Sequence, residues 1–145
     1  SKIGYVAQDT YLLDDTIREN LTFLVNDKTT ISDKEILDIL KLVKLDKFLD
    51  TCQNGLDTII GDRAVRVSGG QKQRISLART LMIKPEILIL DEATSALDFE
   101  NEELILDEIM RLYANKTIIL ITHRKNSLKY CDKNYSLIEG KLTVS

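Results

Sequence analysis

The sequence has few of the residues that define the special classes of small protein. It contains only two cysteines, Cys52 and Cys131, and they lack the CxxC spacing of a zinc or redox site. Nothing at its start resembles a signal peptide, so a reducing interior is expected and both cysteines are interpreted as packing residues. The longest purely apolar runs, at residues 87–90 and 118–121, are far shorter than the roughly 20 residues of a membrane-spanning helix. The chain is therefore expected to be soluble by itself.

An excess of charge of either sign is also missing. The 20 basic and 23 acidic residues are interspersed and give a formal net charge of −3, so there is no basic stripe that could track nucleic acid. The chain has one proline, no repeat and no low-complexity segment, and these absences exclude an obvious linker. With 43% hydrophobic residues among 145, the composition is that of one globular domain with a real core. No nucleic-acid partner is expected.

A possible anion site begins at "RVSGGQKQRISLARTL". Ser68 suits the N-cap of a helix. The apolar face that follows at helical spacing comprises Ile75, Ala78, Leu81 and Met82. The first turn of a helix has unpaired N–H groups and partial positive charge, and Gly69 and Gly70 carry no side chain that would keep a phosphate away. An isolated Ser-Gly-Gly is more often an ordinary loop and cap, so the rest of a pocket has to be found.

Strands and helices alternate along the rest of the chain. "KIGYV" predicts a strand, two Ser/Thr-x-x-Glu pairs predict capped helices, and a short helix is expected over residues 46–52. The capped pairs are Thr16 with Glu19 and Ser32 with Glu35. After Pro85, the run at residues 87–90 predicts a strand of a parallel sheet covered on both faces. A helix with Ile105, Ile109 and Leu112 on one face, an apolar strand in "KTIILITH" and a hairpin in "YSLIEGKLTV" complete an α/β order.

Polar side chains follow directly after three of these predicted strands. They are Gln8 after the first, Asp91 and Glu92 after the second, and His123 after the third. The carboxyl ends of parallel strands meet at one edge of a sheet, where open sheets collect ligands. A lone histidine is more often structural, and adjacent carboxylates are common in loops. Their coincidence at three strand ends favours one shared site.

Five segments together resemble the motifs of ATP-binding cassette (ABC) ATPases. "VSGGQKQR" resembles the signature motif, and the others resemble the Q-loop ("YVAQD"), the Walker B strand ("ILILDE"), the D-loop ("SALD") and the switch histidine ("ITHR"). They occur in the family's order and span nearly the whole chain. The resemblance implies a P-loop NTPase-like parallel sheet core, incomplete here, with a helical signature subdomain and a C-terminal β-hairpin. The resemblance divides the chain into three implied parts. Residues 1–9 contain the Q-loop strand, and residues 10–84 form the helical subdomain and the signature helix. Residues 85–145 contain the Walker B strand, the D-loop, the switch strand and the C-terminal part.

The resemblance also implies a role for each motif residue, with ATP and Mg²⁺ as cofactors. Asp91 would hold the magnesium, helped by Gln8, and Glu92 would be the general base that activates water. His123 would contact the γ-phosphate and help to position Glu92. The residues implied to contact nucleotide or lie where two cassettes meet are Ser68, Gly69, Gly70, Gln71 and Asp98.

Two further segments, "TIREN" and "GLDTIIGDRAVRVSGGQ", resemble exporter-type cassettes, although Asp62 replaces the usual Glu and Ala64 the usual Gly. The implied function is an ATP-hydrolysing motor that drives export or flipping of a substrate. Its partners would be a second cassette and transmembrane domains, at the cytoplasmic face of a membrane. A soluble ABC ATPase of DNA repair or translation would normally add a coiled-coil insertion or basic arm, and neither is present. A non-catalytic interaction module is the third possibility, although Glu92 and His123 are both intact.

The loop G-x-x-x-x-G-K-[ST], which cradles phosphates, is absent from these 145 residues. A helix N-terminus contributes about 0.3–2 kcal/mol toward an anion, whereas even a 1 mM affinity requires about 4 kcal/mol. The chain is therefore expected to be a cassette fragment unable to hydrolyse ATP alone. In the family's sheet the phosphate-loop strand lies beside the switch strand, so residues 116–122 are expected to keep a bare edge. Self-association or a rearranged tail should follow.

Overall fold

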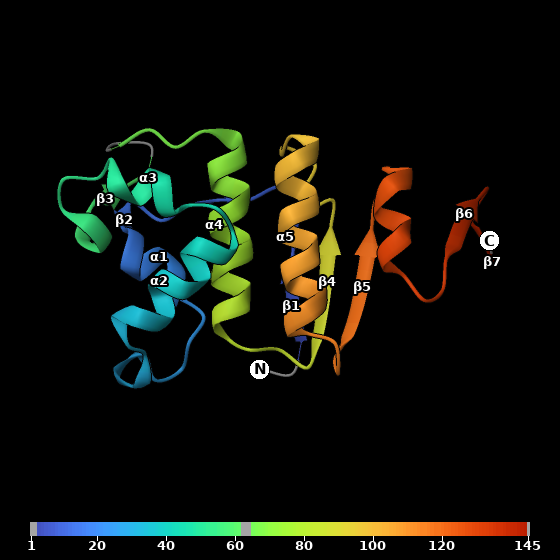
Figure 1. Ribbon diagram of the computed structural model, residues 1–145, viewed down its shortest axis with the longest axis horizontal. Coiled ribbons are helices and arrows are strands. Elements are labelled where there is room, and N and C mark those ends of the chain that lie inside the picture. The colour runs from blue at the N-terminus through green and yellow to red at the C-terminus, as the bar shows by residue number, and fades with distance from the viewer. Residues whose placement is uncertain (1–2, 62–64, 145) are drawn as a thin grey trace.

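A parallel three-stranded sheet forms the centre of the computed structural model, which describes residues 3–61 and 65–144 (Figure 1). Its strands lie in the order β1-β4-β5, with bounds Ile3–Val6, Ile87–Asp91 and Thr117–Ile121. Tyr5 is in register with Ile89, and Ile89 with Ile119. The predicted parallel strands are thus confirmed, and their carboxyl ends share one edge of the sheet.

A group of short elements lies beside the sheet, at the left of Figure 1. They are β2 (Asp15–Thr16), α1 (Ile17–Thr22), η1 (Lys28–Thr30), α2 (Asp33–Leu42), α3 (Asp46–Asp50), η2 (Gly55–Asp57) and β3 (Ile59–Ile60). Both predicted caps are present: the Thr16 hydroxyl accepts from the Glu19 N–H, and Ser32 and Glu35 form a complete capping box. The exporter-loop positions Asp62 and Ala64 lie outside the described residues.

Two long helices build the core, and the first of them links this group to the sheet. They are α4 (Gly69–Met82) and α5 (Phe99–Leu112). The predicted apolar face of α4 is buried, and Ile105 and Ile109 of α5 are buried in the same core as Leu88 and Leu90 of β4. Leu112, predicted on that face of α5, is instead 53% exposed. No helix within the described residues combines the length and apolar character needed to cross a membrane.

Strand β4 is fully buried on one face only, so the expectation that both of its faces are covered is wrong. Leu88 and Leu90 are completely buried, whereas Ile87 and Ile89 between them are only partly buried. On the same open face, Tyr5 is 53% exposed and Ile119 is 46% exposed. A continuous apolar run shows that both faces of a strand could be buried, but it does not show that both are. Among the described residues, no helix packs over this second face.

The C-terminal part continues with η3 (Lys125–Tyr130) and a hairpin of β6 (Tyr135–Ile138) and β7 (Lys141–Val144). The hairpin turns at Glu139 and Gly140, which both have positive φ, as predicted. It forms a separate two-stranded sheet, and β5 is an edge strand of the central sheet. Figure 1 shows the hairpin at the far right, beyond η3. The predicted bare edge is therefore confirmed.

We expect the isolated 145-residue chain to self-associate, because the open edge of β5 and the exposed hairpin side chains recruit partners. Leu137 and Leu142 are 72% and 67% exposed. Sedimentation velocity should show a mass that rises with protein concentration, and Leu137→Lys with Leu142→Lys should shift the population toward monomer. A chain that is monomeric at every concentration would contradict this prediction.

Candidate functional site

Three strand ends bring their polar side chains together at one carboxylate. The Gln8 side chain, after β1, donates from Nε2 to Glu92 Oε2 at 2.7 Å. His123, after β5, places Nε2 3.0 Å from Glu92 Oε1. The Glu92 side chain is 20% exposed, whereas the imidazole is 92% exposed and open to a ligand. The predicted meeting of these residues at one edge of the sheet is therefore what the structure contains.

Asp91, the last residue of β4, lies next to this group and has a different partner. Its Oδ2 accepts a hydrogen bond from the Tyr5 hydroxyl at 2.7 Å. This bond to Asp91 raises the pKa of Tyr5, because ionised tyrosine would face a negative carboxylate. Tyr5 was not predicted as a site residue. Its place one residue before the end of β1, on the face that carries Asp91, is a signal that could have identified it.

The oxygen atoms at this edge of the sheet fit a magnesium site. Within the described residues there is no cluster of three or more carboxylate, histidine or cysteine side chains that could enclose a metal. Mg²⁺ does not need one, because it is usually held by one or two carboxylates, several waters and substrate phosphates. Asp91 offers a carboxylate, and Gln8 uses its amide nitrogen on Glu92, which leaves its carbonyl oxygen as a possible ligand.

The backbone at Glu92 has a conformation that non-glycine residues rarely adopt. Its φ is +47°, which typically costs of the order of 1–3 kcal/mol and concentrates at functional sites. Two contacts hold this conformation: the Glu92 N–H donates to Ile121 O at 3.0 Å, and Glu92 O accepts from Gln73 Nε2 at 2.8 Å. The turn aims the carboxylate at Gln8 and His123 rather than along the strand.

Gln73 attaches helix α4 to the loop after β4, residues 92–98. Its side chain is 3% exposed. Besides Glu92 O, it reaches Ser95 Oγ at 3.2 Å, and its Oε1 accepts from the Ala96 N–H at 2.9 Å. Gly70 permits this close approach, since a Cβ there would lie 3.1 Å from Ala96 O. Gln73 was missed in the sequence, where a polar residue on the buried face of α4 was the available signal.

The start of α4 is a preformed capping box. The Ser68 hydroxyl accepts from the Gln71 N–H at 3.2 Å, and Gln71 Oε1 accepts from the Ser68 N–H at 2.8 Å. The amides of Gly69 and Gly70, in the first turn, have no intrahelical acceptor. The predicted cap is confirmed, and it leaves these two N–H groups for an anion.

Asp98 caps the other long helix. It accepts from the Asn101 N–H at 3.0 Å and from Asn101 Nδ2 at 2.7 Å, and these bonds lower the pKa of Asp98. In the described part of the chain, no hydrogen bond or ion pair joins Asp98 or the Ser68–Gln71 capping box to Gln8, Glu92 or His123. The predicted site residues Gln8, Glu92 and His123 therefore form one cluster, whereas the Ser68–Gln71 capping box and Asp98 lie apart from it.

Replacing Ser68 by alanine should destabilise the chain by about 0.5–2 kcal/mol, the usual cost of losing an N-cap side chain. The matched control is Ser76→Ala, in the middle of α4, where alanine is the better helix former. Urea unfolding followed by circular dichroism measures both. Equal stabilities for the two variants would show that the Ser68 cap has no energetic role.

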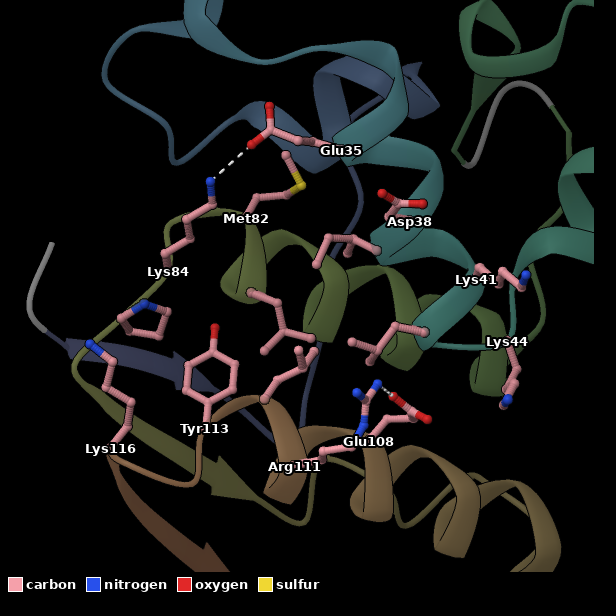
Figure 2. A pocket seen from close by; sticks show the side chains of 15 residues that line it. Glu35, Asp38, Lys41, Lys44, Met82, Lys84, Glu108, Arg111, Tyr113 and Lys116 are labelled. Atoms are coloured by element: carbon pink, nitrogen blue, oxygen red, sulfur yellow. Dashed lines mark hydrogen bonds and ion pairs between the residues drawn. The ribbon is translucent and has the colours of Figure 1, made fainter.

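A groove elsewhere on the molecule takes no part in this cluster. It lies between α2 and the C-terminal ends of α4 and α5 and has a volume of about 720 Å³ (Figure 2). Its apolar lining consists of Ile39, Leu42, Leu81, Met82, Pro85, Leu112 and Tyr113. Four of the charged side chains that line it form two ion pairs, Lys84 with Glu35 at 2.9 Å and Arg111 with Glu108 at 2.5 Å. None of the predicted site residues lines it.

Comparisons with known proteins agree with the motif pattern. The family model described as ABC transporter matches residues 1–95. The chain is 41% identical to the heterocyst differentiation ATP-binding protein HepA of Nostoc sp. over 141 residues, which are 97% of this chain and 23% of that protein. It is 42% identical to ABC transporter B family member 22 of Arabidopsis thaliana, over 97% of this chain and 11% of that protein.

A putative multidrug export ATP-binding/permease protein of Staphylococcus aureus is 40% identical, over 98% of this chain and 24% of that protein. The chain thus spans about a quarter or less of the length of these relatives. Among solved structures, a bacterial Atm1-family ABC exporter with ATP bound superposes with a TM-score of 0.88 at 35% identity, over 98% of this chain and 24% of that one. The chain belongs to the ABC transporter family.

Proposed function

We propose that this chain supplies one half of the ATP site of an ABC exporter, as part of a motor that couples ATP hydrolysis to movement of a substrate across a membrane. The observation that carries the proposal is the Glu92 carboxylate held between Gln8 and His123. A carboxylate fixed at a sheet edge by two oriented side chains is suited to activate water beside a bound phosphate.

In this proposal each member of the cluster has a separate task. Glu92 accepts the proton of the attacking water, and Gln8 and His123 restrict the carboxylate to one orientation. The exposed imidazole of His123 is also free to donate to the γ-phosphate. Such positioning matters because a misplacement of about 1 Å can cost on the order of 10²-fold in rate.

Asp91 and the carbonyl oxygen of Gln8 would hold Mg²⁺ together with the ATP phosphates. When bound, the ion neutralises phosphate charge as the terminal group is transferred. Tyr5 keeps the Asp91 carboxylate at the end of β4 through its 2.7 Å hydrogen bond. This bond uses only Oδ2 of Asp91 and leaves Oδ1 as a possible ligand for the ion.

The capping box at Ser68 to Gln71 is proposed to meet nucleotide held mainly by another cassette, with Asp98 at the interface between the two. Its free amides attract phosphate, but their contribution falls short of binding ATP alone. A phosphate loop supplied outside these 145 residues is therefore required, and the isolated chain should not turn over ATP. The proposed parts are residues 1–9, 10–84 and 85–145, as the motifs divide them.

A second cassette and transmembrane domains are the partners that this proposal requires, at the cytoplasmic face of a membrane. The Arabidopsis relative is named a transporter, and the Staphylococcus relative is named a multidrug export ATP-binding/permease protein. Both names support the exporter type. The soluble ABC ATPase and the interaction module have no comparable support.

The proposal is tested by titrating the chain with a fluorescent ATP analogue and Mg²⁺, first alone and then with a separate segment that carries a phosphate loop. Saturable binding is expected only in the mixture. Tight binding by the chain alone would show that another element replaces the phosphate loop. Absence of binding in both samples, with the mixture shown to associate, would contradict the proposed half-site.

A further inference from the structure

Glu102 is a buried carboxylate in the apolar face of α5. It is 3% exposed and lies three residues before Ile105, which is fully buried. Its Oε1 accepts from Thr94 Oγ1 at 2.8 Å and from Ser127 Oγ at 3.2 Å. Its Oε2 pairs with the guanidinium of Arg124. Glu102 therefore contacts the loop at residues 92–98 and the segment that follows His123.

Arg124 binds the same loop from the other direction. Its NH2 group donates to Ser95 O at 2.9 Å and to Leu97 O at 3.0 Å. Its own backbone N–H is fixed by Thr122 Oγ1 at 3.0 Å. One arginine, adjacent in sequence to His123, thus connects the loop, the helix and the end of β5.

The loop at residues 92–98 is consequently held on two sides by polar side chains that are buried, as Gln73 and Glu102 are, or half-buried, as Arg124 is. Gln73 binds it from α4, through Glu92 O, Ser95 Oγ and the Ala96 N–H. The pair of Glu102 and Arg124 binds it from α5 and η3. The loop begins at Glu92, which is implied to be the general base, and ends at Asp98, which is implied to lie where two cassettes meet.

An ion pair with one buried partner is a poor means of gaining stability alone. The Glu102 side chain is 3% exposed and the Arg124 side chain is 36% exposed, so the carboxylate loses its water while the guanidinium keeps part of its own. Removing a carboxylate from water costs several kcal/mol, which its pairing must offset. What such a pair fixes is geometry, since the planar guanidinium reaches a carboxylate and two carbonyl oxygens in fixed directions. Here those directions set the distance between the loop and His123.

We infer that Glu102 and Arg124 are positioning residues that hold the loop at residues 92–98 in a fixed relation to His123. Their effect on ATP turnover rests on the proposed function, whereas their effect on the two segments does not. Neither residue touches the Glu92 carboxylate. They act through the backbone of the loop and through the chain next to His123.

The test compares Glu102→Gln with Glu103→Gln, its neighbour on α5, which pairs with Lys129 at the surface. Amide hydrogen exchange in the 145-residue chain gives the first readout. Weakening a charge-assisted hydrogen bond raises the equilibrium constant for local opening by a factor of about ten or more. Glu102→Gln should therefore accelerate amide exchange in both residues 95–97 and residues 124–127. Glu103→Gln should leave both segments unchanged.

ATP turnover by the complete polypeptide in which these residues occur gives the second readout. Glu102→Gln should lower kcat by about 10- to 100-fold and leave KM for ATP nearly unchanged, since the residue does not touch nucleotide. Arg124→Lys keeps the positive charge but loses the forked donors of the guanidinium, so it should reproduce the effect. This variant replaces Glu102→Gln in the test if Glu102→Gln does not fold.

Normal kcat and normal exchange in a variant with reduced thermal stability would overturn the inference, because Glu102 would then be merely structural. If the parent polypeptide has no ATP turnover, the proposed function fails. The exchange measurement still decides the positioning role in that case: joint loosening of the two segments supports it, and loosening of neither or of only one contradicts it.

Discussion

Replacing Glu92 by glutamine in the complete polypeptide should lower the rate of ATP hydrolysis by about 10²- to 10⁴-fold, the usual contribution of a general base. Glutamine keeps the shape of the side chain and can still contact Gln8 and His123, but it cannot accept a proton from water. ATP binding should therefore persist while turnover is lost. Phosphate release at saturating ATP and Mg²⁺, together with nucleotide binding by the same sample, separates the two effects.

Glu86→Gln is the matched control for this experiment. Glu86 lies just before β4, at the opposite end of the strand from Glu92, and pairs with Lys116 at the surface. Its replacement should leave turnover unchanged. A loss below tenfold for Glu92→Gln, or an equal loss for both variants, would mean that the catalytic base is a different group.

Replacing Arg79 by leucine should destabilise the fold by about 2–4 kcal/mol, since hydrogen bonds from charged groups contribute about 1.5–3 kcal/mol and a buried acceptor is left unpaired. Arg79 is 6% exposed in α4. Its guanidinium donates to Asn20 O at 2.7 Å and Asn20 Oδ1 at 3.1 Å, and lies 5.6 and 5.7 Å from the ring centres of Tyr11 and Phe23. These contacts fasten α4 to α1 and the loop before it.

Urea unfolding of the 145-residue chain measures this change, with Arg111→Leu as the control. Arg111 is 70% exposed and pairs with Glu108 one turn away. Removing a surface ion pair costs about 0–1 kcal/mol. If both variants lose the same free energy of unfolding, the buried contacts of Arg79 do not hold α4 in place.

The parts of this structure that the sequence predicted are those with local causes. The caps at Thr16, Ser32 and Ser68 require only a hydroxyl and an amide three residues later, and all three are present. The meeting of Gln8, Glu92 and His123 was also predictable, because parallel strands align their carboxyl ends. Local chemistry and sheet geometry together were sufficient for the central cluster.

The features that the sequence did not predict depend on distant partners. β2 and β3 have two residues each, too few for an alternating pattern, and they pair across more than forty positions. A four-residue apolar run could not show that helices cover β4 on one face only. Gln73 and Glu102 were visible only as polar residues within apolar helix faces. Their partners include Glu92, nineteen residues from Gln73, and Arg124, twenty-two residues from Glu102.

The most direct test of the half-site is amide hydrogen exchange of the complete polypeptide with and without ATP and Mg²⁺, using Glu92→Gln to prevent turnover. Bound nucleotide should slow exchange in residues 68–73 at the start of α4 and in residues 91–98 and 121–124 at the strand ends. These segments belong to the capping box and the Glu92 cluster. Nucleotide binding that leaves all three segments unchanged would contradict the account.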